Sequence, residues 1–276
     1  MRLKRTPFGF PNPLNLDAIS SFDMENTAQG YFLEHLNWKD AETVLTEKSV
    51  VVIPIGAQAK QHGHHLPLNN DFLLAEYLKN AIVKRLPVLI APTINYSFYP
   101  AMAEYPGSVS LSRETSSGMF IDIVRSLLKF GPRYFYFLNT GISTIEPLKL
   151  AADVLKTEGA NVTYTDLRIA LKTIRADLEE QTGGTHADEI ETSMMLFIAP
   201  EVVRMAKASR DFTGDGPGPL SREPQPGAVH SPTGAWGDPT LATPEKGEAL
   251  IRALIDGIAD DINGLFNQIA SISNRI

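Results

Sequence analysis

The hydrophobic positions of this chain follow two patterns that alternate along its length. Residues 49–56 form a short, mostly β-branched run that ends at glycine, which is typical of a strand buried on both faces. The segment that begins at Asp71 instead repeats its apolar side chains at helical spacing, as at Leu78 and Ile82. Further runs of the two kinds predict strands at 88–92, 133–139 and 161–166 and helices at 114–130, 145–158 and 185–199.

Alternation of strands with helices predicts a parallel sheet covered by helices on both faces. In such sheets ligands bind beyond the carboxyl ends of the strands, near a switch in strand order. The loops that start at Gly56 and Asn139 both follow predicted strands. We therefore expect them to line one crevice.

Capping signals mark two of the helices. Thr185 with Asp188 is a plausible cap pair for the helix at 185–199, and Pro200 stops it. A final helix is predicted to begin with Thr243 as its N-cap and Pro244 in its first turn.

The chain is expected to form one α/β domain over residues 1–276. Residues 1–35 are polar and rich in turn signals, which predicts an arm packed on the body or on a neighbour. Residues 213–244 are rich in glycine and proline, a composition that fits an ordered loop, a lid or a flexible segment.

Composition narrows the classes of function. A formal net charge of −7 argues against nucleic-acid binding, because no basic face is available to neutralise phosphates. The absence of cysteine excludes disulfides, thiolate metal sites and a cysteine nucleophile. No apolar run reaches the ~20 residues of a membrane span, and the N-terminus has no apolar core of a signal peptide. We expect a soluble, cytoplasmic protein that acts on a small molecule.

Three of the six histidines lie in one loop, directly after the first buried strand. His62, His64 and His65, with Asp71 nine residues after His62, offer imidazole and carboxylate ligands for Zn²⁺ or Mn²⁺. The alternatives are structural: Asp71 also suits a helix N-cap, and the histidines also suit a polar loop with a ring bonded to backbone.

A second cluster lies at the start of the helix predicted at 185–199. Glu191 would share a helix face with methionine and isoleucine side chains, so its carboxylate needs a partner, a metal or a raised pKa. His186 is a candidate general acid/base. A structural hydrogen bond from Glu191 to a neighbouring loop is the competing interpretation.

A third cluster follows the strand predicted at 133–139. Asn139, Ser143 and Thr144 present amide and hydroxyl groups that suit a polar ligand or an oxyanion. A strand-to-helix turn capped by Ser143 or Thr144 explains the same residues without a ligand.

Together these segments resemble the creatininase (creatinine amidohydrolase) family. The resemblance covers most of residues 40–265 in the family's order. It rests on His-Gly-His-His-Leu-Pro at 62–67 with Asp71, Tyr-Pro-Gly-Ser-Val-Ser-Leu at 105–111, His-Ala-Asp-Glu-Ile-Glu-Thr-Ser at 186–193, and the segments 234–239 and 242–247.

The resemblance implies a three-layer αβα fold, a homo-oligomer and, in active relatives, a two-metal centre whose bridging water attacks a C–N bond. His62 and Asp71 stand at two of the family's five ligand positions. The others hold Lys60 in place of a glutamate, Gly141 in place of a histidine, and Ser143. His186 and Glu191 match the family's helix motif, whereas Asp188 replaces its glycine.

We therefore expect an amidohydrolase for a small polar substrate that retains at most one divalent ion, Zn²⁺ or Mn²⁺. His62 and Asp71 would hold the ion, with help from His64, His65 or Glu191. Catalytic roles are expected for His186 as acid/base, for Glu191 and for Lys60, and contacts to substrate for His64, Asn139, Ser143 and Thr144.

Lys60 gives rise to a more specific hypothesis. Its ammonium would occupy the region of one lost metal and neutralise Asp71 or Glu191, unless the side chain points to solvent. One rival interpretation is a family member that binds a small molecule or acts as a scaffold without catalysis. Another is a metal-free hydrolase in which Lys60 or His186 activates Ser143 or Thr144.

Overall fold

The centre of the molecule is a five-stranded sheet with the strand order β1-β3-β2-β4-β5, in which every pair runs parallel. A computed structural model describes residues 29–211 and 219–273 of the chain. The two central strands pair along their whole length, from Val50 opposite Tyr134 to Ile55 opposite Asn139. The strands are β1 (Tyr31–Phe32), β2 (Val50–Ile55), β3 (Leu89–Ile90), β4 (Tyr134–Asn139) and β5 (Asn161–Tyr164).

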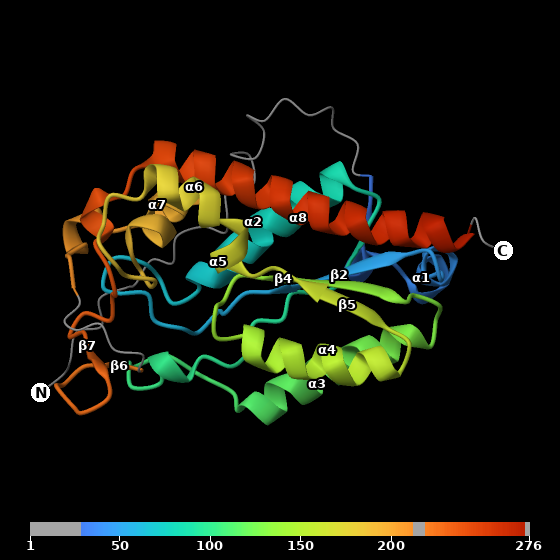
Figure 1. Cartoon of the computed structure of the whole chain (residues 1–276), viewed down its shortest axis with the longest axis horizontal. Helices are drawn as coiled ribbons and strands as arrows, with labels where there is room; N and C mark the ends of the chain where they lie inside the picture. The colour runs from blue at the N-terminus through green and yellow to red at the C-terminus, as the bar shows by residue number, and fades with distance from the viewer. Residues whose placement is uncertain (1–28, 212–218, 274–276) are drawn as a thin grey trace, which may run out of the picture.

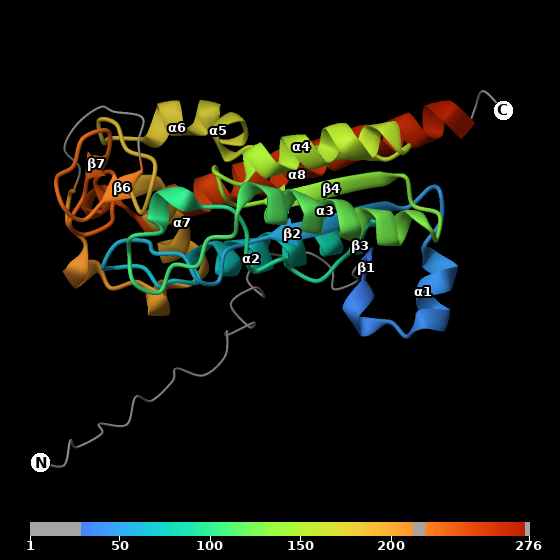
Figure 2. The same ribbon diagram turned by 90° about the horizontal axis from the view of Figure 1, so that it is seen from below.

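Helices cover both faces of this sheet, which confirms the expected three-layer αβα architecture (Figures 1 and 2). One face packs against α2 (Asn70–Arg85), α7 (Glu189–Ile198) and the long α8 (Pro244–Ser273). The other face packs against α3 (Arg113–Leu128) and α4 (Ile145–Thr157).

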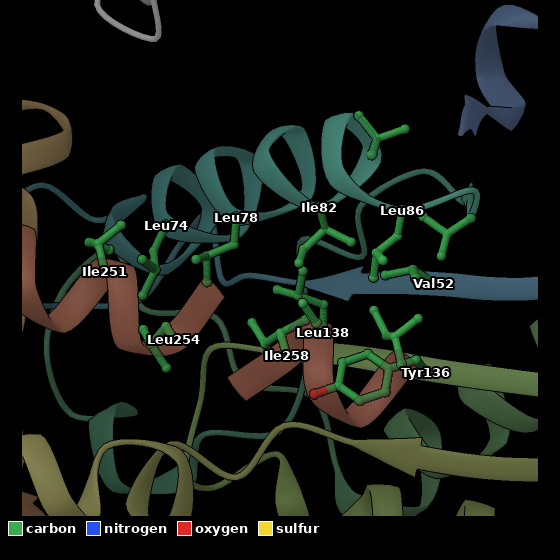
Figure 3. Close-up of a cluster of buried hydrophobic side chains, with 14 of the residues drawn as sticks. Val52, Leu74, Leu78, Ile82, Leu86, Tyr136, Leu138, Ile251, Leu254 and Ile258 are labelled. Carbon is green, nitrogen blue, oxygen red and sulfur yellow. The ribbon is translucent and has the colours of Figure 1, made fainter. Parts of the chain in front are cut away.

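Both faces of β2 are buried, which explains why its sequence shows no alternation of polar and apolar residues. Val50 and Val52 point into the layer formed with α2 and α8, whereas Val51 and Ile53 point into the layer formed with α3 and α4. Figure 3 shows the first layer. There, side chains from α2 and α8 meet Val52, Tyr136 and Leu138 of the sheet.

Shorter elements complete the described chain. They are the helices α1 (Trp38–Val44), α5 (Leu167–Ala170) and α6 (Lys172–Leu178), the strands β6 (Leu220–Ser221) and β7 (Val229–His230), and the 3₁₀ turns η2 (Leu33–His35), η3 (Pro100–Met102), η4 (Pro200–Val202), η5 (Met205–Lys207) and η6 (Pro239–Leu241). The β6–β7 pair and α7 lie together at the left end of the molecule in Figure 1.

The start of one helix differs from the sequence-based expectations, and two predicted segments lie partly outside the described residues. The arm predicted at 1–35 lies mainly outside them, and its last part forms β1, which pairs with β3 at the sheet edge. Within the segment at 213–244, the described residues contain β6, β7 and η6. Helix α7 begins at Glu189, four residues later than predicted, with Asp188 alone as its N-cap.

Thr185 does not cap α7, because the chain at this point is paired elsewhere. The main-chain N–H of Thr185 donates to the carbonyl oxygen of Trp236 at 2.9 Å, and His186 forms an antiparallel bridge with Trp236. The final helix begins as predicted, since the N–H of Lys246 donates to Thr243 Oγ1 at 3.2 Å and Pro244 is the first helical residue.

At Gly247, α8 packs tightly against α7. A Cβ at this position would clash with the main-chain carbonyl of Ser193 and press on Phe197. We expect Gly247→Ala to lower the free energy of unfolding by about 1–3 kcal/mol, because the two helices must separate. Gly257→Ala, in the same helix with nothing within 4 Å of the new Cβ, should raise it by about 0.5–1 kcal/mol. Urea denaturation of both variants measures the difference, and equal effects would exclude a close crossing.

Candidate active site

The candidate site lies at the carboxyl ends of β2 and β4, where the strand order switches. From β2 the chain continues to β3 on one side and later to β4 on the other, so the two loops diverge from neighbouring strand ends. Thr140, which follows β4, donates through its hydroxyl to the carbonyl oxygens of Ile55 and Asp71, at 2.9 and 3.1 Å. The loops that start at Gly56 and Asn139 therefore do meet.

Gly56 allows the end of β2 to touch the first turn of α2. A Cβ on this residue would collide with the carbonyl oxygen of Asp71 and with Ala75. This close approach places the Asp71 side chain beside the loop that leaves β2.

Asp71 is bound by two basic side chains and does not cap its helix. The N-cap of α2 is Asn69. The ammonium of Lys60 donates to Asp71 Oδ2 at 2.8 Å, and His62 Nε2 donates to Asp71 Oδ1 at 2.7 Å. Both carboxylate oxygens are thus committed to these partners.

Lys60 is buried, with only 6% of its surface exposed, so it does not point to solvent. Burial alone would lower the pKa of Lys60, but the negative charges of Asp71 and Glu191 outweigh burial and raise it. Burial would raise the pKa of Asp71, but Lys60 and His62 hold it well below its usual range. The pair is therefore charged at neutral pH, and Lys60 acts as a fixed positive charge and not as a base.

The His62 ring lies between two acceptors. Its Nδ1 is 2.9 Å from the carbonyl oxygen of Lys60, and its Nε2 faces Asp71. Because a carbonyl and a carboxylate only accept, both hydrogen bonds form when both ring nitrogens carry protons. A metal ion on His62 would have to replace one of these protons.

His186 and Glu191 face each other across the start of α7. His186 Nε2 donates to the carbonyl oxygen of Gln61 at 2.9 Å, which leaves Nδ1 at 3.5 Å from Glu191 Oε2. The same oxygen of Glu191 accepts from the N–H of Ala187 at 2.7 Å. Burial, reinforced by His62 and Lys60, lowers the pKa of His186 well below its ordinary value, so the ring is neutral at neutral pH.

Ala187 carries the backbone strain of this site. Its φ of 47° lies in the left-handed region, which residues with a side chain rarely adopt. The strained conformation separates His186, which is bridged to Trp236, from Asp188, which begins the helix. Strain of this kind at a buried polar cluster is typical of functional sites.

One group of donors could hold a metal ion. Ligand atoms of His62, His186 and Glu191 all lie within 4.8 Å of one another. Two imidazoles and a carboxylate suit Zn²⁺ or Mn²⁺. Asp71 lies directly beside this group, but its oxygens are bound to Lys60 and His62.

The other histidines of the loop point elsewhere. His65 is buried and its Nε2 contacts Thr192 Oγ1 at 2.8 Å. His64 is exposed, and with Arg204 and Glu201 it lines a separate cleft of about 450 Å³. Neither belongs to the donor group at His62.

The loop after β4 is held largely by its own contacts. The Asn139 side-chain amide donates to the carbonyl oxygens of Gly141 and Thr165, and its oxygen accepts from the Gly141 N–H. Thr144 is the buried N-cap residue of α4, although its side chain makes no capping bond, and Ser143 is half-buried beside it. Among the described residues, neither hydroxyl is bonded to Lys60 or His186, as the metal-free hydrolase would require.

The sequence analysis assigned no role in the site to Gln61 or to Gly234. The Gln61 amide donates to the Gly234 carbonyl at 2.8 Å, and its oxygen accepts from the Gly63 N–H. Gly234 has no room for a Cβ against Gln61. Gln61 thereby connects the histidine loop to the segment that pairs with His186. The sequence signal for this contact was the glycine-rich motif at 234–239.

His65 should make the stability of the fold depend on pH. Burial, with His62 and His64 nearby, lowers the pKa of His65 from 6.5 to about 4. Between these values the unfolded chain binds a proton that the folded chain does not, so stability falls as the pH drops from 6.5 to about 4.

Urea denaturation at several pH values tests this dependence. We expect His65→Gln to flatten the slope of stability in this interval, while the exposed His35→Gln leaves the wild-type slope unchanged. An unchanged slope in His65→Gln would contradict the assignment.

Comparison with known proteins identifies the family of this chain. The family model for creatininase, described as creatinine amidohydrolase, matches residues 34–262. This chain belongs to the creatininase family. It is 27% identical to the creatinine amidohydrolase of Pseudomonas putida, over 87% of this chain and 98% of that protein. It is also 27% identical to a mycofactocin precursor peptide peptidase of Mycolicibacterium smegmatis, over 77% of this chain and 84% of that protein.

Solved creatininase structures share the fold. A crystal structure of creatinine amidohydrolase superposes with a TM-score of 0.74 at 26% identity, covering 86% of this chain and 98% of the other. Two further creatininase structures, each with a TM-score of 0.73, are described as an Mn form and as a mutant of the Zn–Zn type. Creatininases thus bind Mn or Zn. Within residues 29–211 and 219–273, no helix has both the length and the apolar character needed to cross a membrane.

Proposed function

We propose that this creatininase-family amidohydrolase cleaves an amide or cyclic amide C–N bond of a small polar substrate at His62, His186 and Glu191. The proposal rests on the convergence of these three side chains, from the loop after β2 and from the start of α7, at the strand ends. Relatives include a creatinine amidohydrolase, a peptide peptidase and, at 23% identity, a 3-dehydro-scyllo-inosose hydrolase of Thermotoga maritima. The names of these relatives refer to different substrates, so they do not identify creatinine as the substrate of this chain.

His186 and Glu191 are the proposed proton-handling pair. Because His186 Nε2 is held by Gln61, proton exchange at this ring takes place at Nδ1, which faces Glu191. The neutral ring can accept a proton from an attacking water and return it to the leaving nitrogen. Glu191, held by the Ala187 N–H, orients the ring and stabilises its charged form.

Alternatively, the same donors suit one divalent ion, and His186 is then a ligand and not the acceptor of the proton. A Zn²⁺ or Mn²⁺ held by His62, His186 and Glu191 would supply a polarised water. Lys60 places a fixed positive charge beside this group, which lowers the energy of negative charge that develops on substrate oxygen. Asp71 keeps that charge in position.

The test combines metal analysis with a substrate panel. Protein purified without chelator is analysed for metal and incubated with cyclic amides, linear ureas and short peptides. We expect turnover of one class, with loss of both activity and bound metal in His62→Ala. Retained turnover in His62→Ala would exclude the proposed centre.

The contacts of both Asp71 oxygens with Lys60 and His62 favour a second candidate, a family member that binds a small polar ligand without cleaving it. This candidate predicts thermal stabilisation by a panel compound that stays intact on prolonged incubation, and no metal in any preparation. Release of an amine or ammonia from the compound excludes it.

A further inference from the structure

Lys60 is an unusual residue for its position. Lysine is almost never fully buried unless it is paired, because its long side chain can reach water. Here its side chain is 8% exposed, and its ammonium contacts a carboxylate that is 3% exposed. The cation is therefore enclosed within the site.

Both oxygens of Asp71 already contact basic side chains. Lys60 binds one oxygen at 2.8 Å and His62 binds the other at 2.7 Å. Lys60 is also attracted by Glu191, the carboxylate of the donor group. The ammonium thus pairs directly with Asp71 and offsets part of the negative charge of Glu191.

This arrangement does not fit a pair of metal ions. A carboxylate shared by two ions must offer both oxygens, and a second cation close to an ammonium meets strong repulsion in a poorly solvated site. His62 has the same conflict, since its Nε2 bonds to Asp71. The remaining donor group is His62, His186 and Glu191. His62 can join an ion only by giving up one of its two hydrogen bonds, so this group holds one ion at most.

We propose that the Lys60 ammonium is a built-in cation that takes the place of one metal ion at this centre. Asp71 then serves as its counter-ion and not as a metal ligand. The chain binds at most one divalent ion, and Lys60 is the residue that sets this limit.

Metal titration of the intact chain tests the inference. Mn²⁺ or Zn²⁺ binding is followed by isothermal titration calorimetry and by native mass spectrometry, in wild type, Lys60→Met and Lys60→Glu. We expect no more than one ion in wild type. Lys60→Glu, which frees Asp71 and adds a carboxylate, should bind one further ion or tighten Mn²⁺ binding by about tenfold or more.

Lys79→Met is the matched control, because Lys79 is also buried and paired, with Glu76 at 2.7 Å, but belongs to α2 outside the donor group. Its metal stoichiometry should equal that of wild type. Two ions in wild type overturn the inference, and so does a Lys60→Glu variant that folds but binds metal as wild type does.

Folding of the variants is checked by circular dichroism. If the Lys60 variants do not fold, the metal stoichiometry of the wild type and of Asp71→Asn still tests the inference. Asp71→Asn should leave bound metal unchanged if Asp71 is no ligand, and loss of metal in this variant contradicts the proposal. Because the readout is bound metal and not turnover, failure of the proposed hydrolysis would leave this result unaffected.

Discussion

Asp71→Asn should lower the free energy of unfolding by about 3–5 kcal/mol, because it leaves the buried Lys60 ammonium without its counter-charge. Asparagine keeps the size of the side chain, so the effect reports charge and not a cavity. Urea denaturation of the wild type and the variant measures it. Asp256→Asn is the control: this residue pairs with Arg85 on the surface, where its side chain is 65% exposed, and should change stability by less than about 1 kcal/mol.

A double-mutant cycle measures the interaction energy between Lys60 and Asp71 separately from their contacts with other residues. Lys60→Met should also destabilise, since Asp71 would keep only His62 as a partner. The double variant Lys60→Met/Asp71→Asn should lose clearly less than the sum of the single changes, because no isolated charge remains. Additive losses, or an Asp71→Asn variant as stable as wild type, would show that the two side chains do not form the buried pair.

Loss of the proton-handling pair should have the largest effect on turnover. His186→Ala and Glu191→Gln are each expected to lower kcat/KM by about 10²-fold or more on whichever panel substrate the wild type cleaves. Glutamine can still accept from the Ala187 N–H, so Glu191→Gln removes the charge with little change of shape.

The control for this pair is His35→Ala, an exposed histidine in the η2 turn, whose kcat/KM should stay within about twofold of wild type. Steady-state kinetics at pH 7 to 8 gives the comparison. Full activity in both His186→Ala and Glu191→Gln would remove these residues from the reaction.

The sequence predicted the layered fold well, because the strands and helices that form it carry strong local signals. β2 and β4 are buried on both faces and therefore appear as apolar runs, and α2 shows its apolar stripe at helical spacing. β1 was not predicted, because two residues give no period and its position depends on pairing with β3. The start of α7 was predicted too early, because Thr185 and His186 pair with Trp236, fifty residues later in the chain.

The sequence predicted which residues belong to the candidate site better than it predicted how they are arranged. The sequence names His62, His64 and His65 as site candidates, with His62 at a ligand position of the family, but the structure places the three rings in different surroundings. Only His62 joins His186 and Glu191. Ring direction depends on backbone torsions and on partners such as Thr192, and spacing along the chain does not encode these.

Asp71 shows the same limit. Its place in the first turn of a helix fits a cap and a ligand equally well by sequence. The role of Asp71 depends on the neighbouring end of β2, because Gly56 lets Asp71 approach the loop that carries Lys60 and His62. The family motif shows that Lys60 replaces a glutamate. That Lys60 is buried could be learned only from the structure.

Anomalous diffraction from crystals soaked in Mn²⁺ or Zn²⁺ tests most directly whether Lys60 has taken the place of a metal ion. We expect no more than one anomalous peak, bounded by His62, His186 and Glu191, with Lys60 Nζ still in contact with Asp71. Two peaks bridged by the Asp71 carboxylate, with Lys60 displaced, would contradict it.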